Sequence, residues 1–175
     1  MIDNKLKKIA KFLTKNNYTV ATAESCTGGL LSSRFTDISG SSNFVMANFV
    51  TYANEAKHEY LNVSNEILEN FGAVSEECAN AMAKGLHNRT NCNLAICTTG
   101  IAGPTGGTKG KPVGLMYVSV YFNNKVCVKK ILLPKFLPRK LMKFCFTQKA
   151  IEFAWEIIGN WKDDKYIMYL SSFLD

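Results

Sequence analysis

The chain lacks the sequence signs of membrane insertion, secretion and structural metal binding. It has no run of about 18 apolar residues, which a membrane-spanning helix requires, and residues 1–5 lack the apolar segment of a signal peptide. Its six cysteines contain no C-x-x-C pair and only two histidines accompany them, so neither a zinc site nor a disulfide framework is predicted. We therefore expect a cytoplasmic protein that binds no metal and contacts no membrane.

Negative charge is missing from a long stretch of the sequence. Between Cys78 and Ile151 there are twelve Lys or Arg and no Asp or Glu, and the net charge of the chain is +7. This stretch favours an anionic partner, although a solvated basic face has the same composition. Its aromatic residues lie in apolar runs typical of a core, which gives little support to base stacking. We expect a phosphate-bearing small molecule rather than nucleic acid.

Several common catalytic motifs are also absent. Neither glycine-rich segment has the Lys and Ser/Thr that a P-loop needs after its last glycine, and G-x-S-x-G does not occur. Ser25 has no lysine three residues later, which excludes the S-x-x-K pattern. His58 and His87 fall in expected helices, where a histidine is usually satisfied or faces solvent. A Ser-His-Asp triad is therefore not predicted.

The sequence does contain alternating helical and strand-like segments. Apolar spacing predicts helices over 3–16, 30–35, 53–60, 64–71, 76–89 and 138 to about 158, and strands over 18–23, 44–52, 94–98, 113–122 and 125–133. The pair Asn123-Asn124 suits a two-residue hairpin with positive φ at both positions. These elements predict a single α/β domain over 1–175 (core about 5–158), a three-layer α/β/α sandwich with a mixed sheet. Residues 160–175 are expected to form a short tail that packs on the body or on a partner.

A polar segment, TAESCTGG at 22–29, lies where the first strand gives way to a helix. Helix N-termini carry free N–H groups and a partial positive charge, and glycines allow close approach of a ligand to the backbone. The segment therefore favours phosphate or an oxyanion, although an ordinary N-cap followed by a tight turn has the same residues. Ser25 is the candidate nucleophile. Cys26 is the alternative, because thiols near helix N-termini can have a lowered pKa.

Polar residues also end two other predicted strands. Tyr52 follows the second strand and Thr99 follows the strand that begins at Leu94, while Lys57 comes shortly after Tyr52 in a predicted helix. Ligands of open α/β sheets bind at strand ends. A serine without a histidine can be activated by a lysine amine or a tyrosine oxygen. Tyr52 or Lys57 is therefore the candidate base, although a core-edge tyrosine and a surface lysine would have the same spacing.

Six blocks in order resemble the CinA C-terminal domain family. They are TAESCTGG (22–29), ISGSS (38–42), FVTYANEAK (49–57), GAVS (72–75), GIAGP (100–104) and KPVG (111–114). The resemblance implies a nicotinamide mononucleotide (NMN) amidohydrolase, which releases ammonia from the carboxamide and leaves nicotinate mononucleotide. It implies the stand-alone deamidase form, with no cofactor, and a homodimer is expected.

The resemblance also implies roles for individual residues. Ser25 is assigned as nucleophile, with Tyr52, Lys57 and Thr99 in support. Substrate binding is expected from Cys26, Thr27, Gly28, Gly29, Gly100, Gly103, Gly106, Arg139 and Lys143, the last two for the phosphate. Two family carboxylates are missing, because the Gly-Asp-Arg signature is Leu137-Pro138-Arg139 here and the aspartate after Gly-Pro is Thr105. A relative that binds a nucleotide without turning it over is therefore the second hypothesis.

Overall fold

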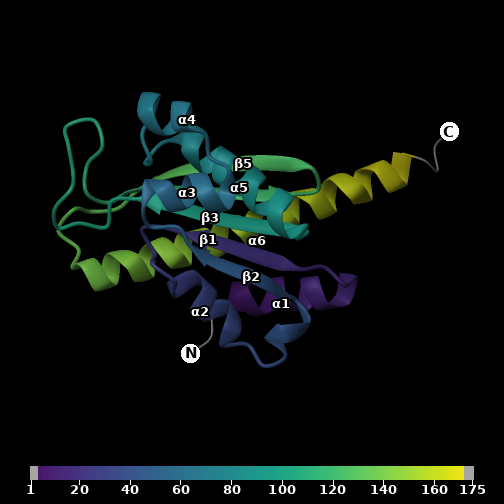
Figure 1. The fold of residues 1–175 in the computed structure, drawn as a ribbon. Coiled ribbons are helices and arrows are strands. Elements are labelled where there is room, and N and C mark those ends of the chain that lie inside the picture. The colour runs from purple at the N-terminus through teal and green to yellow at the C-terminus, as the bar shows by residue number, and fades with distance from the viewer. Residues whose placement is uncertain (1–3, 172–175) are drawn as a thin grey trace.

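A five-stranded mixed sheet forms the centre of the protein (Figure 1). The computed structural model describes the backbone of residues 4–171 and the side chains of residues 4–162. The strands are β1 (Val20–Glu24), β2 (Val45–Val50), β3 (Leu94–Gly100), β4 (Leu115–Phe122) and β5 (Lys125–Leu132), in the order β2-β1-β3-β4-β5. β1 pairs in parallel with β2 and β3, whereas β4 runs antiparallel to β3 and β5. The predicted mixed sheet with one hairpin is confirmed.

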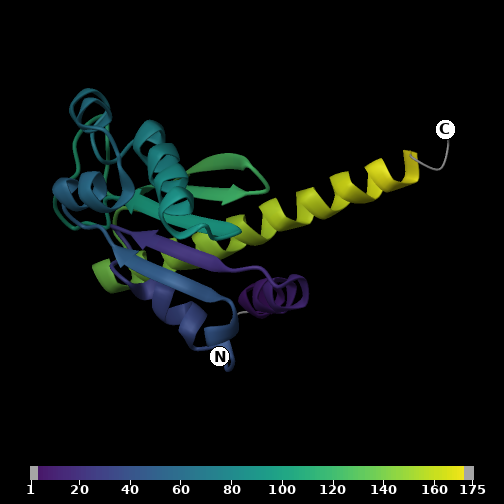
Figure 2. The same ribbon diagram turned by 45° about the vertical axis from the view of Figure 1, so that its right-hand side comes forward.

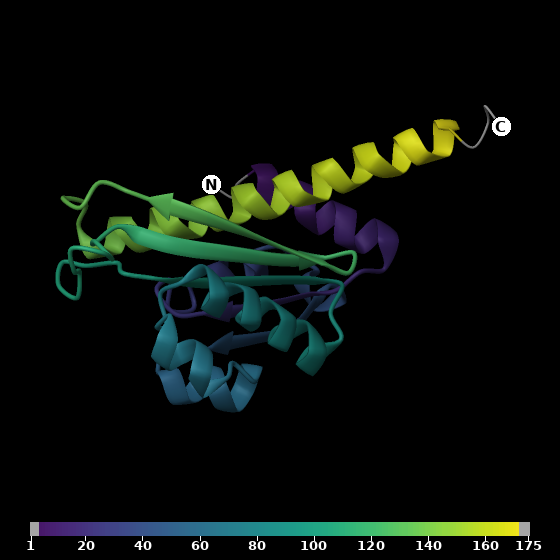
Figure 3. The same cartoon turned by 90° about the horizontal axis from the view of Figure 1, so that it is seen from above.

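Helices cover both faces of this sheet. One face carries α1 (Asn4–Asn16), α2 (Leu30–Thr36) and α6 (Arg139–Ser171), and the other carries α3 (Asn54–Leu61), α4 (Asn65–Asn70) and α5 (Glu76–Thr90). Figures 2 and 3 show the two helical layers on opposite sides of the strands. The three-layer α/β/α prediction is therefore confirmed. None of the helices in the described part of the chain is long and apolar enough to cross a membrane.

Local sequence explains most of these elements. All five residues of β1 are buried, as expected for a central parallel strand covered on both faces. The edge strand β2 instead alternates between half-buried and exposed side chains. The hairpin between β4 and β5 turns at Asn123 and Asn124, whose φ values are 49° and 60°. Positive φ at both positions matches the turn type predicted from this pair.

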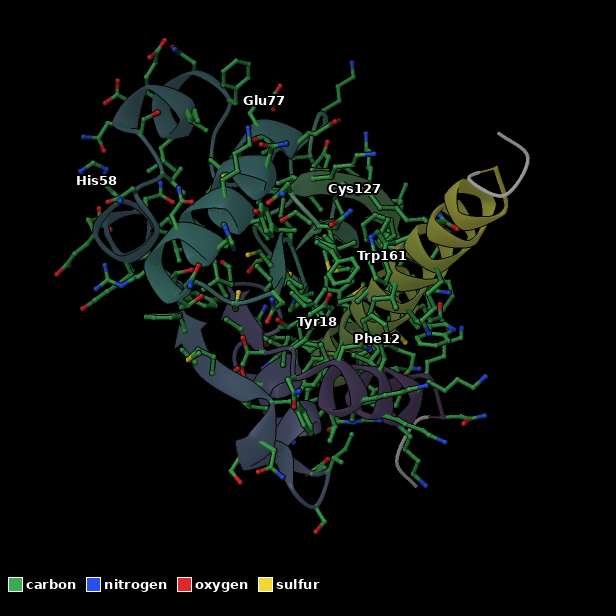
Figure 4. All side chains as sticks on the ribbon, turned by 90° about the vertical axis from the view of Figure 1, so that its right-hand side faces the viewer. Phe12, Tyr18, His58, Glu77, Cys127 and Trp161 are labelled. Atoms are coloured by element: carbon green, nitrogen blue, oxygen red, sulfur yellow. The ribbon has the colours of Figure 1, made fainter. Side chains whose placement is uncertain are left out.

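The last helix, α6, is longer than predicted. Gly159 and Asn160 are residue types that commonly end a helix, and the sequence therefore predicts an end near 158. The helix continues because Trp161 packs edge-on against Phe12 (ring centroids 6.0 Å apart) and Phe122 (5.3 Å). Figure 4 shows Trp161 beside Phe12 and Tyr18. The helix end predicted near 158 is therefore wrong, because α6 continues to Ser171. The packing expected for the side chains of the tail lies outside the described residues from 163 onward.

The order of the strands brings the ends of β1 and β3 together at one edge of the sheet. β1 connects to β2 through α2 on one face, and β2 connects to β3 through α3, α4 and α5 on the other face. β1 thus leads to β2 on one side and β3 leads to β4 on the other, so the chain diverges at the carboxyl ends of β1 and β3, which is where open α/β sheets bind ligands. Ser25, the residue directly after β1, lies at this position.

Candidate functional site

Ser25 and Lys57 come together at the carboxyl end of β1. The backbone N–H of Ser25 donates to the carbonyl of Thr98 in β3 at 3.0 Å, which fixes the start of the loop between β1 and α2. Lys57 lies in α3, and its Nζ is 3.4 Å from Ser25 Oγ. The side chain of Lys57 is only 1% exposed. A serine hydroxyl and a buried amine therefore share the strand-end site.

Lys57 is buried, and its Nζ is hydrogen-bonded to backbone carbonyls. Its Nζ donates to the carbonyls of Thr51 (2.9 Å) and Tyr52 (3.2 Å), and reaches that of Ala53 at 3.5 Å. No ion pair of the described residues involves Lys57. Burial lowers the pKa of the amine below its ordinary value of 10.5. Nζ is also within hydrogen-bond distance of Ser25 Oγ, and an amine that has lost its proton carries a lone pair that can accept the hydroxyl proton.

Tyr52, the other candidate base, is held by Arg139. Arg139 opens α6, and its Nη2 donates to Tyr52 Oη at 3.0 Å while its Nη1 donates to the carbonyl of Gly103 at 2.6 Å. The arginine thus joins the end of β2 to the loop after β3. Tyr52 is 60% exposed. Of the two candidate bases, Lys57 is the one hydrogen-bonded to Ser25.

A second cation of α6 lies over the first glycine loop. A Cβ built on Gly28 would be 3.1 Å from Lys143 Nζ, and Gly28 has a φ of +59°. Gly29, with a φ of +89°, precedes the first residue of α2. Arg139 and Lys143 are four residues apart, which places them on the same side of α6. The basic residues predicted to hold phosphate therefore border the loop that carries Ser25.

The thiol of Cys26 is placed differently from the Ser25 hydroxyl. It is 4% exposed and belongs to the larger hydrophobic core. Burial raises the pKa of this thiol to about 12, so it is protonated at neutral pH. Thr27 is also buried, and its Oγ1 lies 2.8 Å from Thr98 Oγ1. These two side chains anchor the loop rather than face a ligand.

The residues predicted in the second glycine loop have internal partners. Thr99 is buried, and its hydroxyl donates to the carbonyl of Ala73 at 2.6 Å. A Cβ at Gly100 would meet the carbonyl oxygen of Leu115 at 2.5 Å, and a Cβ at Gly103 would meet a methyl group of Val113. Gly106 is exposed with a φ of +85°. Packing within the loop accounts for Gly100 and Gly103, and the contact with Arg139 brings the Gly103 carbonyl to the site.

Comparison with known proteins identifies the relatives of this chain. Residues 3–158 match the model of the CinA C-terminal domain family. The chain belongs to this family. A protein of Thermoanaerobacter pseudethanolicus named as competence-damage inducible is 50% identical over 125 residues, which is 71% of this chain and 30% of that protein. One of Clostridioides difficile is 50% identical over 122 residues, 70% of this chain and 29% of that protein. The chain thus spans about a third of the length of these curated CinA relatives.

Solved structures of CinA proteins have the same fold. Competence damage-inducible protein A of Klebsiella pneumoniae is 28% identical with a TM-score of 0.85, covering 90% of this chain and 96% of that one. The competence/damage inducible protein of Agrobacterium tumefaciens is 37% identical with a TM-score of 0.79, covering 87% and 95%. A CinA superfamily protein of Escherichia coli is 30% identical with a TM-score of 0.82, covering 87% of each chain. The resemblance drawn from the six blocks is confirmed.

The two departures from the CinA signatures lie near Arg139. Pro138 precedes Arg139, and its carbonyl accepts the N–H of Met142 at 2.9 Å, which makes Pro138 the N-terminal cap position of α6. Thr105 is exposed in the loop that Arg139 holds through Gly103. Arg139 takes part in no ion pair of the described residues. No carboxylate of the described residues therefore forms an ion pair with its guanidinium group.

Glu24 is the residue of this CinA site that the sequence reading missed. It is 0% exposed, and its carboxylate accepts the N–H groups of Gly29 (3.0 Å), Leu31 (3.0 Å) and Ser32 (2.7 Å) and the hydroxyl of Ser32. The chain's own carboxylate thus accepts the backbone N–H groups at the start of α2. An acidic residue six positions before the first residue of α2 was the available signal.

Proposed function

We propose that this chain is an amidohydrolase that converts NMN to nicotinate mononucleotide and ammonia with Ser25 as the nucleophile. The observation that carries the proposal is the buried amine of Lys57, which lies 3.4 Å from Ser25 Oγ at the carboxyl edge of the sheet and takes part in no ion pair of the described residues. A general base needs to be neutral at working pH and within hydrogen-bond range of the proton it takes. Membership of the CinA family, which includes amidohydrolases, supports the same reaction.

The proposed reaction proceeds through an acyl-enzyme. Ser25 Oγ attacks the carboxamide carbon while Lys57 takes the hydroxyl proton, and a tetrahedral oxyanion forms. Lys57 then gives this proton to the departing nitrogen, so that ammonia leaves and an ester to Ser25 remains. A water molecule, deprotonated by Lys57, attacks the ester carbon. Nicotinate mononucleotide is released, and the proton returns to Ser25 Oγ.

The substrate phosphate is proposed to lie on Arg139 and Lys143. Both belong to the acid-free part of the chain, and no described ion pair involves either of them. Guanidinium and ammonium groups form charge-assisted hydrogen bonds with phosphate oxygens. The nucleotide would then extend from α6 toward the first glycine loop, with its carboxamide at Ser25. A homodimer is part of the same proposal and rests on the resemblance to the stand-alone deamidases.

Ammonia release tests the proposed reaction. The purified chain is incubated with NMN, and ammonia is followed with a coupled glutamate dehydrogenase assay. Ser25→Ala should reduce the rate to the background, whereas Ser33→Ala, which removes an exposed hydroxyl from α2, should leave it unchanged. A wild type that releases no ammonia, or a Ser25→Ala variant as active as the wild type, would contradict the proposal.

A nucleotide-binding protein without turnover is the second candidate. The absence of the family carboxylates at Thr105 and in Leu137-Pro138 favours it. Calorimetric titration with NMN separates the two functions. Binding without ammonia release supports the binding protein, and absence of binding excludes both.

A further inference from the structure

Glu24 and the loop that follows it carry a further inference about how this site stabilises a transition state. We infer that the backbone N–H groups of Cys26 and Thr27 form the oxyanion hole. Glu24 acts as a positioning residue, because its carboxylate accepts the N–H groups at the start of α2 and so holds the loop that carries these two donors. The inference deepens the proposed function and rests on it, because it takes Ser25 as the nucleophile.

Most backbone N–H groups of residues 25–32 already have acceptors. Three N–H groups serve the turn itself: Ser25 donates to Thr98 at 3.0 Å, Gly28 to Ser25 at 3.1 Å and Leu30 to Thr27 at 3.4 Å. Three others donate to the carboxylate of Glu24, namely those of Gly29, Leu31 and Ser32. Among residues 25–32, Cys26 and Thr27 are the two whose N–H groups have no acceptor on another residue.

Glu24 is fixed from two elements. Its carboxylate has no exposed surface and receives four hydrogen bonds from the first turn of α2, which are strong because the acceptor is charged. Ser32, one of the donors, lies with its Oγ 2.8 Å from Thr22 Oγ1 in β1. The carboxylate therefore ties the strand before Ser25 to the helix after it. Residues 25–28 are held between these two fixed ends.

These two N–H groups belong to the residues that directly follow the nucleophile, next to the place where charge develops on attack. When Ser25 Oγ adds to a carboxamide, the carbonyl oxygen gains negative charge near the backbone of the residues that follow the nucleophile. The side chains of Cys26 and Thr27 are buried, and Thr27 contacts Thr98 at 2.8 Å, so both peptide units are anchored from inside the protein. Donors held in this way need no reorganisation during the reaction.

The experiment measures the reactivity of Ser25 in a Glu24→Gln variant. Glutamine keeps the shape of the side chain, but its NH2 group cannot accept a backbone N–H, so the first turn of α2 and residues 25–28 must shift. The rate at which diisopropyl fluorophosphate labels Ser25 is followed by mass spectrometry, because the phosphoryl oxygen of this reagent also needs an oxyanion hole. We expect the labelling rate and kcat for NMN to fall about 100-fold, with KM unchanged.

A matched control variant and the labelling assay separate failure of this inference from failure of the proposed function. Glu66→Gln makes the same change in the first turn of α4, where the carboxylate is exposed, and should be labelled at the wild-type rate. If the wild type is labelled but does not hydrolyse NMN, the proposed substrate is wrong, and the labelling ratio still decides this inference.

Three results bear on Glu24 directly. A folded Glu24→Gln variant labelled as fast as the wild type overturns the inference, and so does a wild-type Ser25 that the reagent does not label. If circular dichroism shows that Glu24→Gln does not fold, Glu24→Asp replaces it. Aspartate keeps the charge but withdraws it by one methylene group, and the same comparison of labelling rates applies.

Discussion

Single residues decide which group of the site can act as a base. Tyr52 and Lys57 are equivalent candidates in the sequence, because spacing places both beside the end of the second strand. The structure separates them: Lys57 is buried beside Ser25, whereas Tyr52 is exposed and bonded to Arg139. Burial of Lys57 depends on the packing of α3 against α5. A lysine in an amphipathic sequence gives no sign of such a tertiary contact, so its burial could not be predicted.

The lowered pKa of Lys57 predicts the pH dependence of the reaction. Burial shifts the pKa below 10.5, so the amine becomes neutral at a lower pH than a free lysine does, and a neutral amine can take the Ser25 proton. We expect kcat for NMN to rise with pH and to level off below 10.5. Lys57→Arg keeps a cation that does not lose its proton, and should lower kcat at least 100-fold. A pH–rate profile of both proteins checks this, and an arginine variant with the wild-type profile would contradict it.

A substitution at Gly28 tests whether the proposed phosphate site depends on the first glycine loop. Alanine at this position would hold φ at +59°, a strained value for a side chain, and would bring its Cβ to 3.1 Å from Lys143 Nζ. We expect Gly28→Ala to cost about 1–2 kcal/mol of the free energy of unfolding and to raise KM for NMN by displacing Lys143. Gly110→Ala is the control, because a Cβ there has no neighbour within 4 Å. Equal KM values for the two variants would contradict a role of Lys143 in substrate binding.

At the scale of helices and strands, the sequence predicted where the candidate site lies better than it predicted the hydrogen bonds within it. The carboxyl ends of parallel strands meet at one edge, so Ser25 and the residues after β2 and β3 could be placed together from hydrophobic periodicity alone. The hairpin at Asn123-Asn124 followed from local turn chemistry. Glu24 was missed because an acidic residue at the end of a strand is usually exposed to solvent. Its role depends on the folding of the first turn of α2 around the carboxylate. The length of α6 was missed because Trp161 packs on residues distant in sequence.

Substitution of Gly85 tests whether the packing of α3 against α5 holds Lys57 in place. Gly85 lies in α5 directly against the last residue of α3, and a Cβ built on it would overlap the carbonyl of Leu61. Because α3 carries Lys57, Gly85→Ala should push this helix away, cost about 1–3 kcal/mol of the free energy of unfolding and lower kcat. Gly159→Ala in α6 has open space around its Cβ and should stabilise the protein by about 0.5–1 kcal/mol. Urea denaturation measures both, and equal stabilities would contradict the packing argument.

At the scale of the whole molecule, α6 runs from the candidate site to turns that extend beyond the rest of the domain (Figures 1 and 3). Its first residue holds Tyr52 and the second glycine loop, its middle packs on the sheet, and its last turns extend past the other elements (Figures 1 and 3). Lys162 lies over the ring of Phe12 at 4.5 Å and over that of Trp155 at 4.8 Å. The described contacts between α6 and the body therefore extend to Lys162, and the sequence beyond it includes Tyr166, Ile167, Tyr169 and Leu170.

The proposed homodimer predicts that this extension acts in assembly and not in catalysis. A chain that ends at Lys162 keeps the contacts of Trp161 and Lys162 with Phe12 and every residue proposed to act on NMN, so its kcat and melting temperature should equal those of the full chain at low concentration. Light scattering after gel filtration should give twice the 19.5 kDa chain mass for the full chain and a monomer for the shortened one. A shortened chain that remains a dimer would place the interface on the body. A shortened chain that loses kcat while staying folded would instead mean that residues after Lys162 complete the site of a second copy.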